Sequence, residues 1–149
     1  MKYLSRSLEE TNKIALDFIK NLEKQKSDKA LVVGLFGDLG SGKTTFTQAL
    51  GKHLKIKEIM TSPTFVIMKK YSINQSTIYN IQSTNLIHID AYRLESGKEL
   101  LNLDFIEMQN DPQNLILIEW PERVGNILPA DLIKVNFKFI NDTEREIML

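Results

Sequence analysis

Hydrophobic positions along the chain follow two spacings, which predict helices in some segments and strands in others. Ser7 and Glu10 form a capping-box pattern, and the apolar positions behind them recur at helical spacing, at Ile14, Ala15, Phe18, Ile19 and Leu22. Apolar runs at residues 30–36, 86–89 and 115–118 predict strands, and the first is apolar almost throughout, as expected for a strand that is covered on both faces in a parallel sheet. The first of these strands is expected at the centre of the sheet.

Weaker patterns between and after these runs predict edge strands and a shorter helical region. Residues 65–71 have strand character, residues 74–76 resemble a turn, and residues 77–79 fit a returning strand, so a long hairpin or a surface flap is expected here. Apolar residues on both sides of Leu103-Asp104 predict helical packing with a break at that point. Alternation in the last part of the chain predicts a terminal β-hairpin around Asn141-Asp142-Thr143.

A glycine-rich motif follows the first apolar strand. Residues 37–44 are Gly-Asp-Leu-Gly-Ser-Gly-Lys-Thr, which fits G-x-x-x-x-G-K-[ST]. The glycines let successive backbone N–H groups turn inward around a phosphate, and the helix predicted next points its positive dipole end at the same place. Lys43 is expected to reach the β and γ phosphates, and Thr44 to offer its hydroxyl to the magnesium ion that accompanies them. The sequence therefore predicts a nucleotide phosphate site with Mg²⁺.

Two acids follow apolar strands and are candidates for the same site. Asp90 and Glu119 come directly after the second and third apolar runs, and in an open parallel sheet ligands bind at the carboxyl ends of the strands. Mg²⁺ usually takes one or two carboxylates beside the phosphates. One acid could hold the ion with Thr44 while the other orients the attacking water, or both could bind through waters. A further acid, Asp38, lies inside the loop and is expected to face away from the phosphates or to be linked to the metal.

Four other residues are weaker candidates for the site. Thr64 follows a Ser-Pro pair and is either a switch-loop hydroxyl that senses the γ phosphate or a hydroxyl at the start of a strand. His88 lies within an apolar strand and is interpreted mainly as a satisfied core histidine. Arg93 suits a phosphate, a partner or the nearby acids. Trp120 follows an acid at a strand end and is either core filler or a ring that lines the site.

Composition limits the classes of function. The 149 residues suggest one domain, residues 1–149, with 19 basic and 19 acidic side chains. With no net charge, no long-range field draws the chain toward nucleic acid or an anionic membrane, so any contact with RNA is expected to be indirect. The absence of cysteine excludes disulfides and thiolate nucleophiles. No signal-peptide pattern and no bilayer-spanning apolar run is evident, and a cytoplasmic protein is expected.

Together these patterns predict an α/β fold: a single P-loop NTPase domain whose mainly parallel central sheet is flanked by helices and bordered by antiparallel strands. Four segments of the chain closely resemble the TsaE (YjeE) family of ATPases, at residues 37–45, 61–65, 88–94 and 118–123. The resemblance implies an ATPase accessory to the synthesis of threonylcarbamoyladenosine at position 37 of tRNA. It also implies a TsaB and TsaD pair as partner, which ATP binding and hydrolysis reset for turnover.

The resemblance also carries residue roles onto this chain. The family's ATP and magnesium residues fall on Leu39, Gly40, Ser41, Gly42, Lys43, Thr44, Thr45, Asp90 and Glu119. Thr64 falls in the switch-like loop, Trp120 beside the second acid, and Thr11 on a segment near the nucleotide. Two departures stand out: Ala91 replaces the family's usual leucine after the aspartate, and residues 72–85 are longer than the family's short turn.

Three functions are compatible with a phosphate loop in a chain of this size. The first is a Mg²⁺-dependent ATPase that turns over slowly alone, because no arginine finger of its own is evident, and that is completed by a partner. The second is a small-molecule kinase, against which stands the lack of an Arg-rich lid segment. The third is a binding module in which ATP only orders the loop of residues 61–64.

Overall fold

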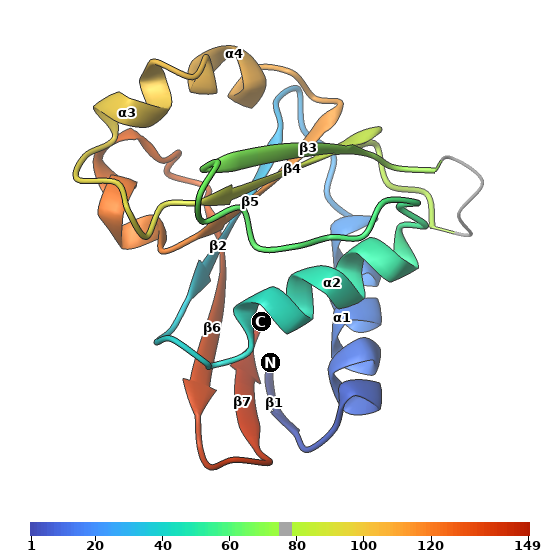
Figure 1. Ribbon diagram of the computed structural model, residues 1–149. Coiled ribbons are helices and arrows are strands. Elements are labelled where there is room, and N and C mark those ends of the chain that lie inside the picture. The colour runs from blue at the N-terminus through green and yellow to red at the C-terminus, as the bar shows by residue number, and fades with distance from the viewer. Residues whose placement is uncertain (75–78) are drawn as a thin grey trace.

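One mixed sheet organises the computed structural model, which describes residues 1–74 and 79–149 (Figure 1). Its strands in the described residues run in the order β1-β7-β6-β2-β5-β4-β3. Their bounds are Lys2–Ser5 (β1), Leu31–Phe36 (β2), Met68–Ser72 (β3), Asn85–Asp90 (β4), Asn114–Glu119 (β5), Ile133–Phe139 (β6) and Arg145–Met148 (β7). The central strands β6, β2, β5 and β4 are parallel, whereas β7, β1 and β3 join antiparallel at the two edges. The predicted fold class is confirmed, and β2 lies at the centre as expected.

Helices cover both faces of the sheet and divide the core in two. Helices α1 (Leu8–Leu22) and α2 (Lys43–His53) lie side by side on one face. The short helices α3 (Lys98–Leu101) and α4 (Phe105–Gln109) and the 3₁₀ segment η1 (Pro121–Ile127) belong to the other. Alternation along β5 sends Leu117 into the first core and Ile116 and Ile118 into the second. This explains why the strand is apolar throughout.

The first helix forms where its capping pattern predicts it. The Ser7 side chain accepts a hydrogen bond from the Glu10 N–H at 3.1 Å, and all five apolar positions of the predicted stripe are buried. The Glu10 carboxylate accepts from the Arg6 N–H at 2.6 Å, one residue earlier than in a standard capping box. The chain enters α1 directly from β1, so these contacts also fix the angle between the edge strand and the helix.

The structure corrects the predicted strand at residues 65–71. Strand β3 begins only at Met68, because Ile67 adopts a left-handed backbone with φ 66° that interrupts the extended chain. Phe65 and Val66 precede this bend and are 84% and 65% exposed. The expected turn at residues 74–76 and the returning strand at residues 77–79 both include residues outside those that the structure describes.

Other local predictions are confirmed, and one strand was missed. The helical region breaks at Asp104, whose φ of 59° separates α3 from α4. Strands β6 and β7 form the terminal hairpin, with Phe139 opposite Arg145. Strand β1 was not predicted, because it is short and its partner β7 comes from the far end of the chain.

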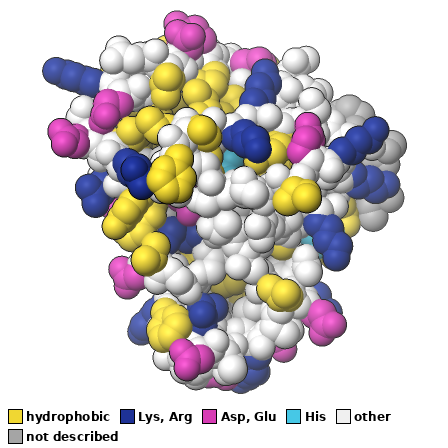
Figure 2. Space-filling model, in the orientation of Figure 1, with side chains coloured by type: hydrophobic (Ala, Val, Ile, Leu, Met, Phe, Trp, Pro, Cys, Tyr) yellow, Lys and Arg dark blue, Asp and Glu magenta, His cyan; other side chains and the backbone are white. Residues whose placement is uncertain are grey.

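The surface offers no dominant charged area in the view of Figure 2. Lys and Arg side chains are spread among Asp and Glu side chains, and hydrophobic side chains gather toward the upper left. None of the helices within the described residues is both long and apolar enough to cross a membrane.

Candidate functional site

A glycine-rich loop connects the end of β2 to the start of α2. Gly37, Gly40 and Gly42 have φ values of 145°, 75° and 104°, which side chains with a Cβ rarely adopt. At Gly37 a Cβ would also collide with the carbonyl oxygen of Phe137. Gly42 is the N-cap of α2, whose first N–H groups have no partner within the helix. The loop therefore turns backbone donors and a positive helix end toward one point.

Lys43 lies across this loop. Its Nζ donates to the carbonyl oxygens of Gly37 at 2.6 Å and Asp38 at 2.8 Å, and it lies 4.5 Å from the centre of the Trp120 ring. Burial lowers the pKa of Lys43 from its ordinary value, and the carboxylate of Glu119 acts in the opposite direction. The ammonium is thus held at the loop by backbone oxygens that an anion can replace.

The two predicted acids lie next to each other at the carboxyl ends of adjacent strands. Asp90 of β4 is in register with Glu119 of β5, and both are buried, with 4% and 3% of their surface exposed. Strand alternation places them on the sheet face that α2 covers, the face to which Leu86 and Leu117 also belong. The phosphate-type loop and the acids therefore meet on one side of the sheet.

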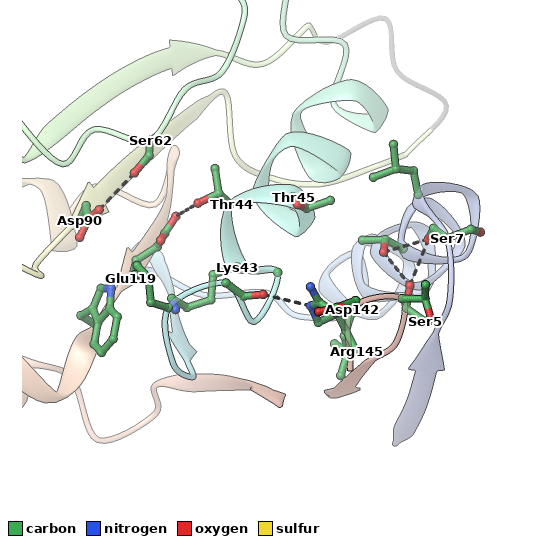
Figure 3. Close-up of a pocket in the computed structure, with 18 of the residues that line it drawn as sticks. Ser5, Ser7, Lys43, Thr44, Thr45, Ser62, Asp90, Glu119, Asp142 and Arg145 are labelled. Carbon is green, nitrogen blue, oxygen red and sulfur yellow. Dashed lines mark hydrogen bonds between the residues drawn. The ribbon is translucent and has the colours of Figure 1, made fainter. Parts of the chain in front are cut away.

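The acids have different partners (Figure 3). Glu119 Oε1 accepts from the Thr44 hydroxyl at 3.3 Å and lies 2.9 Å from His88 Nε2. Asp90 instead accepts from the hydroxyls of Thr64 and Ser62 and from the Tyr92 N–H, at 2.7, 3.2 and 2.9 Å. Glu119 is therefore linked to helix α2, and Asp90 is linked to the segment that precedes β3.

A cavity of about 530 Å³ lies between the loop, the acids and the edge of the sheet. The structure brings nearly all of the predicted site residues to its wall: Thr11, Leu39, Gly40, Gly42, Lys43, Thr44, Thr45, Thr64, Asp90, Glu119 and Trp120. Ser41 is absent from the wall, since it is fully buried beneath the loop, and its Oγ has no partner among the described residues. Asp38 is exposed and does not line the cavity, which fits the first of its two expected arrangements.

The opposite wall of the cavity comes from residues that the sequence did not indicate. Ser5, Arg6, Ser7 and Leu8 contribute from one end of the chain and Asp142, Thr143, Arg145 and Ile147 from the other. Arg145 Nε donates to the Gly40 carbonyl oxygen at 3.0 Å, and the hydroxyls of Ser5 and Thr11 lie 2.7 Å apart. The pairing of β1 with β7 creates this wall, and no local pattern in the sequence indicates that pairing.

Three residues with open interpretations are now placed. Trp120 lines the cavity and lies beneath Lys43, so its ring belongs to the site. The Arg93 guanidinium lies 4.4 Å from the centre of the Phe65 ring, outside the cavity. His88 is buried against Glu119, and its Nδ1 has no partner among the described residues. It is therefore a buried histidine, as interpreted from the sequence, and its partner is the acid at the end of the neighbouring strand.

The donor set suits a magnesium ion that is held jointly with phosphate. No group of three or more His, Cys, Asp or Glu side chains in the described part of the chain is arranged to hold a metal ion alone. Thr44 and Glu119 supply two neighbouring oxygens beside the glycine-rich loop. Mg²⁺ prefers such oxygen ligands and commonly takes the rest from phosphates and water.

These features define a class of protein. It is a single-domain α/β protein whose candidate site lies between the glycine-rich loop after the central strand, the helix that follows the loop, and the acids at the adjacent strand ends. More particularly, the chain belongs to the TsaE family. The family model described as "Threonylcarbamoyl adenosine biosynthesis protein TsaE" matches residues 5–147.

Individual relatives agree with this assignment. The tRNA threonylcarbamoyladenosine biosynthesis protein TsaE of Rickettsia typhi is 37% identical over 140 residues, which cover 93% of this chain and 87% of the relative. The protein of the same name from Bacillus subtilis is 38% identical over 116 residues, covering 78% and 66% of the two chains. Among solved structures, Bacillus subtilis YdiB matches with a TM-score of 0.69 at 31% identity, covering 99% of this chain and 82% of that one.

Proposed function

We propose that this chain binds and hydrolyses ATP with Mg²⁺ and acts as an accessory protein in the biosynthesis of threonylcarbamoyladenosine in tRNA. One observation carries the ATPase part: the glycine-rich loop, Lys43, Thr44 and the carboxylates of Asp90 and Glu119 all line one cavity. The names of the relatives supply the pathway, since each is called a tRNA threonylcarbamoyladenosine biosynthesis protein. The cytoplasm is the compartment we propose for this work.

The roles of the site residues follow from their contacts. Backbone N–H groups of the loop bind the phosphates, and Lys43 exchanges its carbonyl partners for phosphate oxygens. Thr44 and Glu119, whose oxygens already lie 3.3 Å apart, would hold Mg²⁺. Such an ion would supply charge neutralisation at the phosphate oxygens.

Asp90 receives a different role in this proposal. Three donors already occupy its carboxylate, two of them from residues 62 and 64. These contacts favour Glu119 as the direct magnesium ligand and Asp90 as the group that orients the attacking water and holds the switch-like loop.

Exposed apolar side chains beside this loop favour an ATPase cycle that depends on a partner protein. Phe65 and Val66 directly follow Thr64 and expose 84% and 65% of their surface. A protein that binds these side chains would act on the segment whose hydroxyl meets Asp90. We propose that a TsaB and TsaD pair is this partner and that ATP hydrolysis resets the pair. With no net charge on the chain, contact with tRNA is proposed to be indirect.

The experiment follows threonylcarbamoyladenosine over many turnovers. A purified TsaB and TsaD pair receives threonylcarbamoyl adenylate and tRNA, with or without this chain and ATP, while released phosphate is measured in parallel. We expect multiple turnover only when both chain and ATP are present. Lys43→Ala should abolish it, because each lost hydrogen bond to a charged group weakens binding by about 1.5–3 kcal/mol, or roughly tenfold or more.

Lys52→Ala is the matched control, because Lys52 lies on the same helix but is exposed and outside the cavity. This variant should support turnover like the wild type. If the chain has no effect on an active pair, the accessory role is wrong. A phosphorylated small molecule formed from ATP and a metabolite mixture would then favour the kinase interpretation.

A further inference from the structure

A buried pair, His88 and Glu119, lies beneath the cavity. Their side chains are 1% and 4% exposed, and His88 Nε2 is 2.9 Å from Glu119 Oε1. His88 precedes Asp90 by two positions on β4, so its ring shares the face of the sheet that carries both acids. It does not line the cavity. Any role in the site must therefore act through Glu119.

The hydrogen bonds assign the proton of the imidazole. An ionised carboxylate only accepts hydrogen bonds, so Nε2 must carry the hydrogen that faces Glu119. Nδ1 is buried and has no partner among the described residues. His88 is accordingly assigned as the donor of the hydrogen bond to the carboxylate.

Two donors converge on a single oxygen of Glu119. His88 Nε2 and the Thr44 hydroxyl both contact Oε1, at 2.9 and 3.3 Å, whereas no described residue donates to Oε2 in the hydrogen bonds of the structure. A carboxylate with one oxygen held from two sides cannot rotate freely about its last bond. The shorter of the two bonds comes from His88, the partner that is itself fixed within a strand.

We infer that His88 is a positioning residue, which orients the Glu119 carboxylate for binding Mg²⁺ together with Thr44. This inference rests on the proposed function, since it assigns a purpose to an acid that is proposed to bind the ion. Carboxylate ligands of metals are commonly held by hydrogen bonds from a surrounding layer of residues, whose loss weakens metal binding roughly 10–100-fold. Without its donor, Glu119 must be reoriented each time that Mg²⁺ binds.

The test measures metal binding separately from nucleotide binding. Affinity for the non-hydrolysable analogue AMP-PNP is measured by calorimetry in Mg²⁺ and again in EDTA, and Mn²⁺ binding is followed by electron paramagnetic resonance. His88→Phe keeps a ring in the buried space but removes the donor. We expect this variant to need roughly 10–100-fold more metal, while its affinity for the analogue in EDTA stays that of the wild type.

Rescue and control variants distinguish positioning from general damage. In His88→Gln the side-chain amide can donate from about the place of Nε2, so metal binding should return to within about threefold of the wild type. His53→Phe removes the other histidine, whose Nε2 lies 3.0 Å from the Asn12 carbonyl oxygen. His53 does not line the cavity, so this variant should leave the metal requirement unchanged. If H88F does not fold, H88N, whose amide is too short to reach Glu119, is compared with H88Q instead.

The possible outcomes decide between the two proposals. A loss of analogue affinity in H88F that is equal with and without metal, or no loss at all, would overturn the positioning role and leave the proposed function standing. A wild-type chain whose analogue binding does not respond to Mg²⁺ would overturn the proposed function, and the positioning role with it.

Discussion

Lys43 makes the stability of the unliganded chain depend on pH. Burial lowers its pKa in the folded state, whereas the unfolded chain keeps the ordinary value of 10.5. Between these two pKa values the unfolded state binds more protons, so the free energy of unfolding rises with pH across that window. The cost of burying the charge is fully present below the folded-state pKa and is lost above 10.5.

The pH dependence is measured by comparison with Lys43→Met, which removes the titrating group and keeps the length of the side chain. Urea unfolding is followed at several pH values from neutral to 10.5. We expect the stability of the wild type, relative to the variant, to increase as pH rises. A difference in stability that is constant, or that falls with pH, would show that folding does not lower the pKa of Lys43.

The two acids should respond differently to loss of charge. Glu119→Gln removes the charge beside Thr44, so the gain in nucleotide affinity that Mg²⁺ provides should fall at least tenfold. Asp90→Asn changes the group that Thr64 and Ser62 contact. We expect it to keep the Mg²⁺ effect on binding, to slow hydrolysis by about 10²-fold, and to increase proteolysis within residues 61–67. Equal loss of the Mg²⁺ effect in both variants would mean that both acids bind the ion.

At the scale of residues, the motif identified the loop and the acids because each carries its chemistry in local sequence. His88 could not be recognised in this way. A histidine in an apolar strand is compatible with a core role, and only the register of β4 and β5 brings it against Glu119. The position of Ser41 could not be predicted either: it belongs to the motif, but its side chain lies beneath the loop and not in the cavity wall.

At the scale of elements, helix α2 ends in a motif that can be improved. The N–H of Ile56 donates to the Gly51 carbonyl oxygen and that of Lys55 to the Lys52 carbonyl oxygen, at 3.0 and 3.2 Å, which is the Schellman pattern. Lys55 occupies its left-handed position with φ 52°, where glycine is favoured. Lys55→Gly should stabilise the chain by about 0.5–1 kcal/mol, or roughly 1–4 °C in Tm.

The control for this change is Lys52→Gly, within the last turn of the same helix. Glycine there should lower the free energy of unfolding by about 0.5–1 kcal/mol. Both variants are compared with the wild type by thermal unfolding and by nucleotide affinity. Because this end of α2 lies away from the cavity, affinity should not change in either. Destabilisation by K55G would mean that the side chain of Lys55 contributes more than its backbone strain costs.

Element prediction succeeded where an element carries its own pattern. The stripe of α1, the apolar runs of β2, β4 and β5 and the break at Asp104 are all local features. The predicted start of β3 was wrong: apolar residues 65–67 have strand propensity, but Ile67 adopts a left-handed bend and Phe65 is exposed. The Asp90 N–H donates to the Ile67 carbonyl oxygen at 2.8 Å, a contact with β4 that no local pattern indicates.

At the scale of the whole molecule, the site depends on a contact between the two ends of the chain. Ser5 of β1 pairs with Arg145 of β7, and this pairing closes the cavity opposite the acids. The parallel centre of the sheet was predictable because burial on both faces leaves an apolar run in the sequence. The edge was not, since the polar residues of β1 and of the hairpin tip have no local pattern that indicates a shared wall.

A cavity built from the centre of the sheet and from both chain ends should couple ligand binding to global stability. A ligand that binds only the folded state stabilises it by about 2.7 kcal/mol at a concentration one hundred times its Kd. For a chain of this size, Mg²⁺ and AMP-PNP at that concentration should raise Tm by roughly 6–10 °C. EDTA should remove most of the shift in the wild type, whereas in Glu119→Gln the shift should already be small and change little with EDTA. A shift that is the same in Mg²⁺ and EDTA for the wild type would show that the nucleotide binds without the ion, and the magnesium role of Thr44 and Glu119 would be wrong.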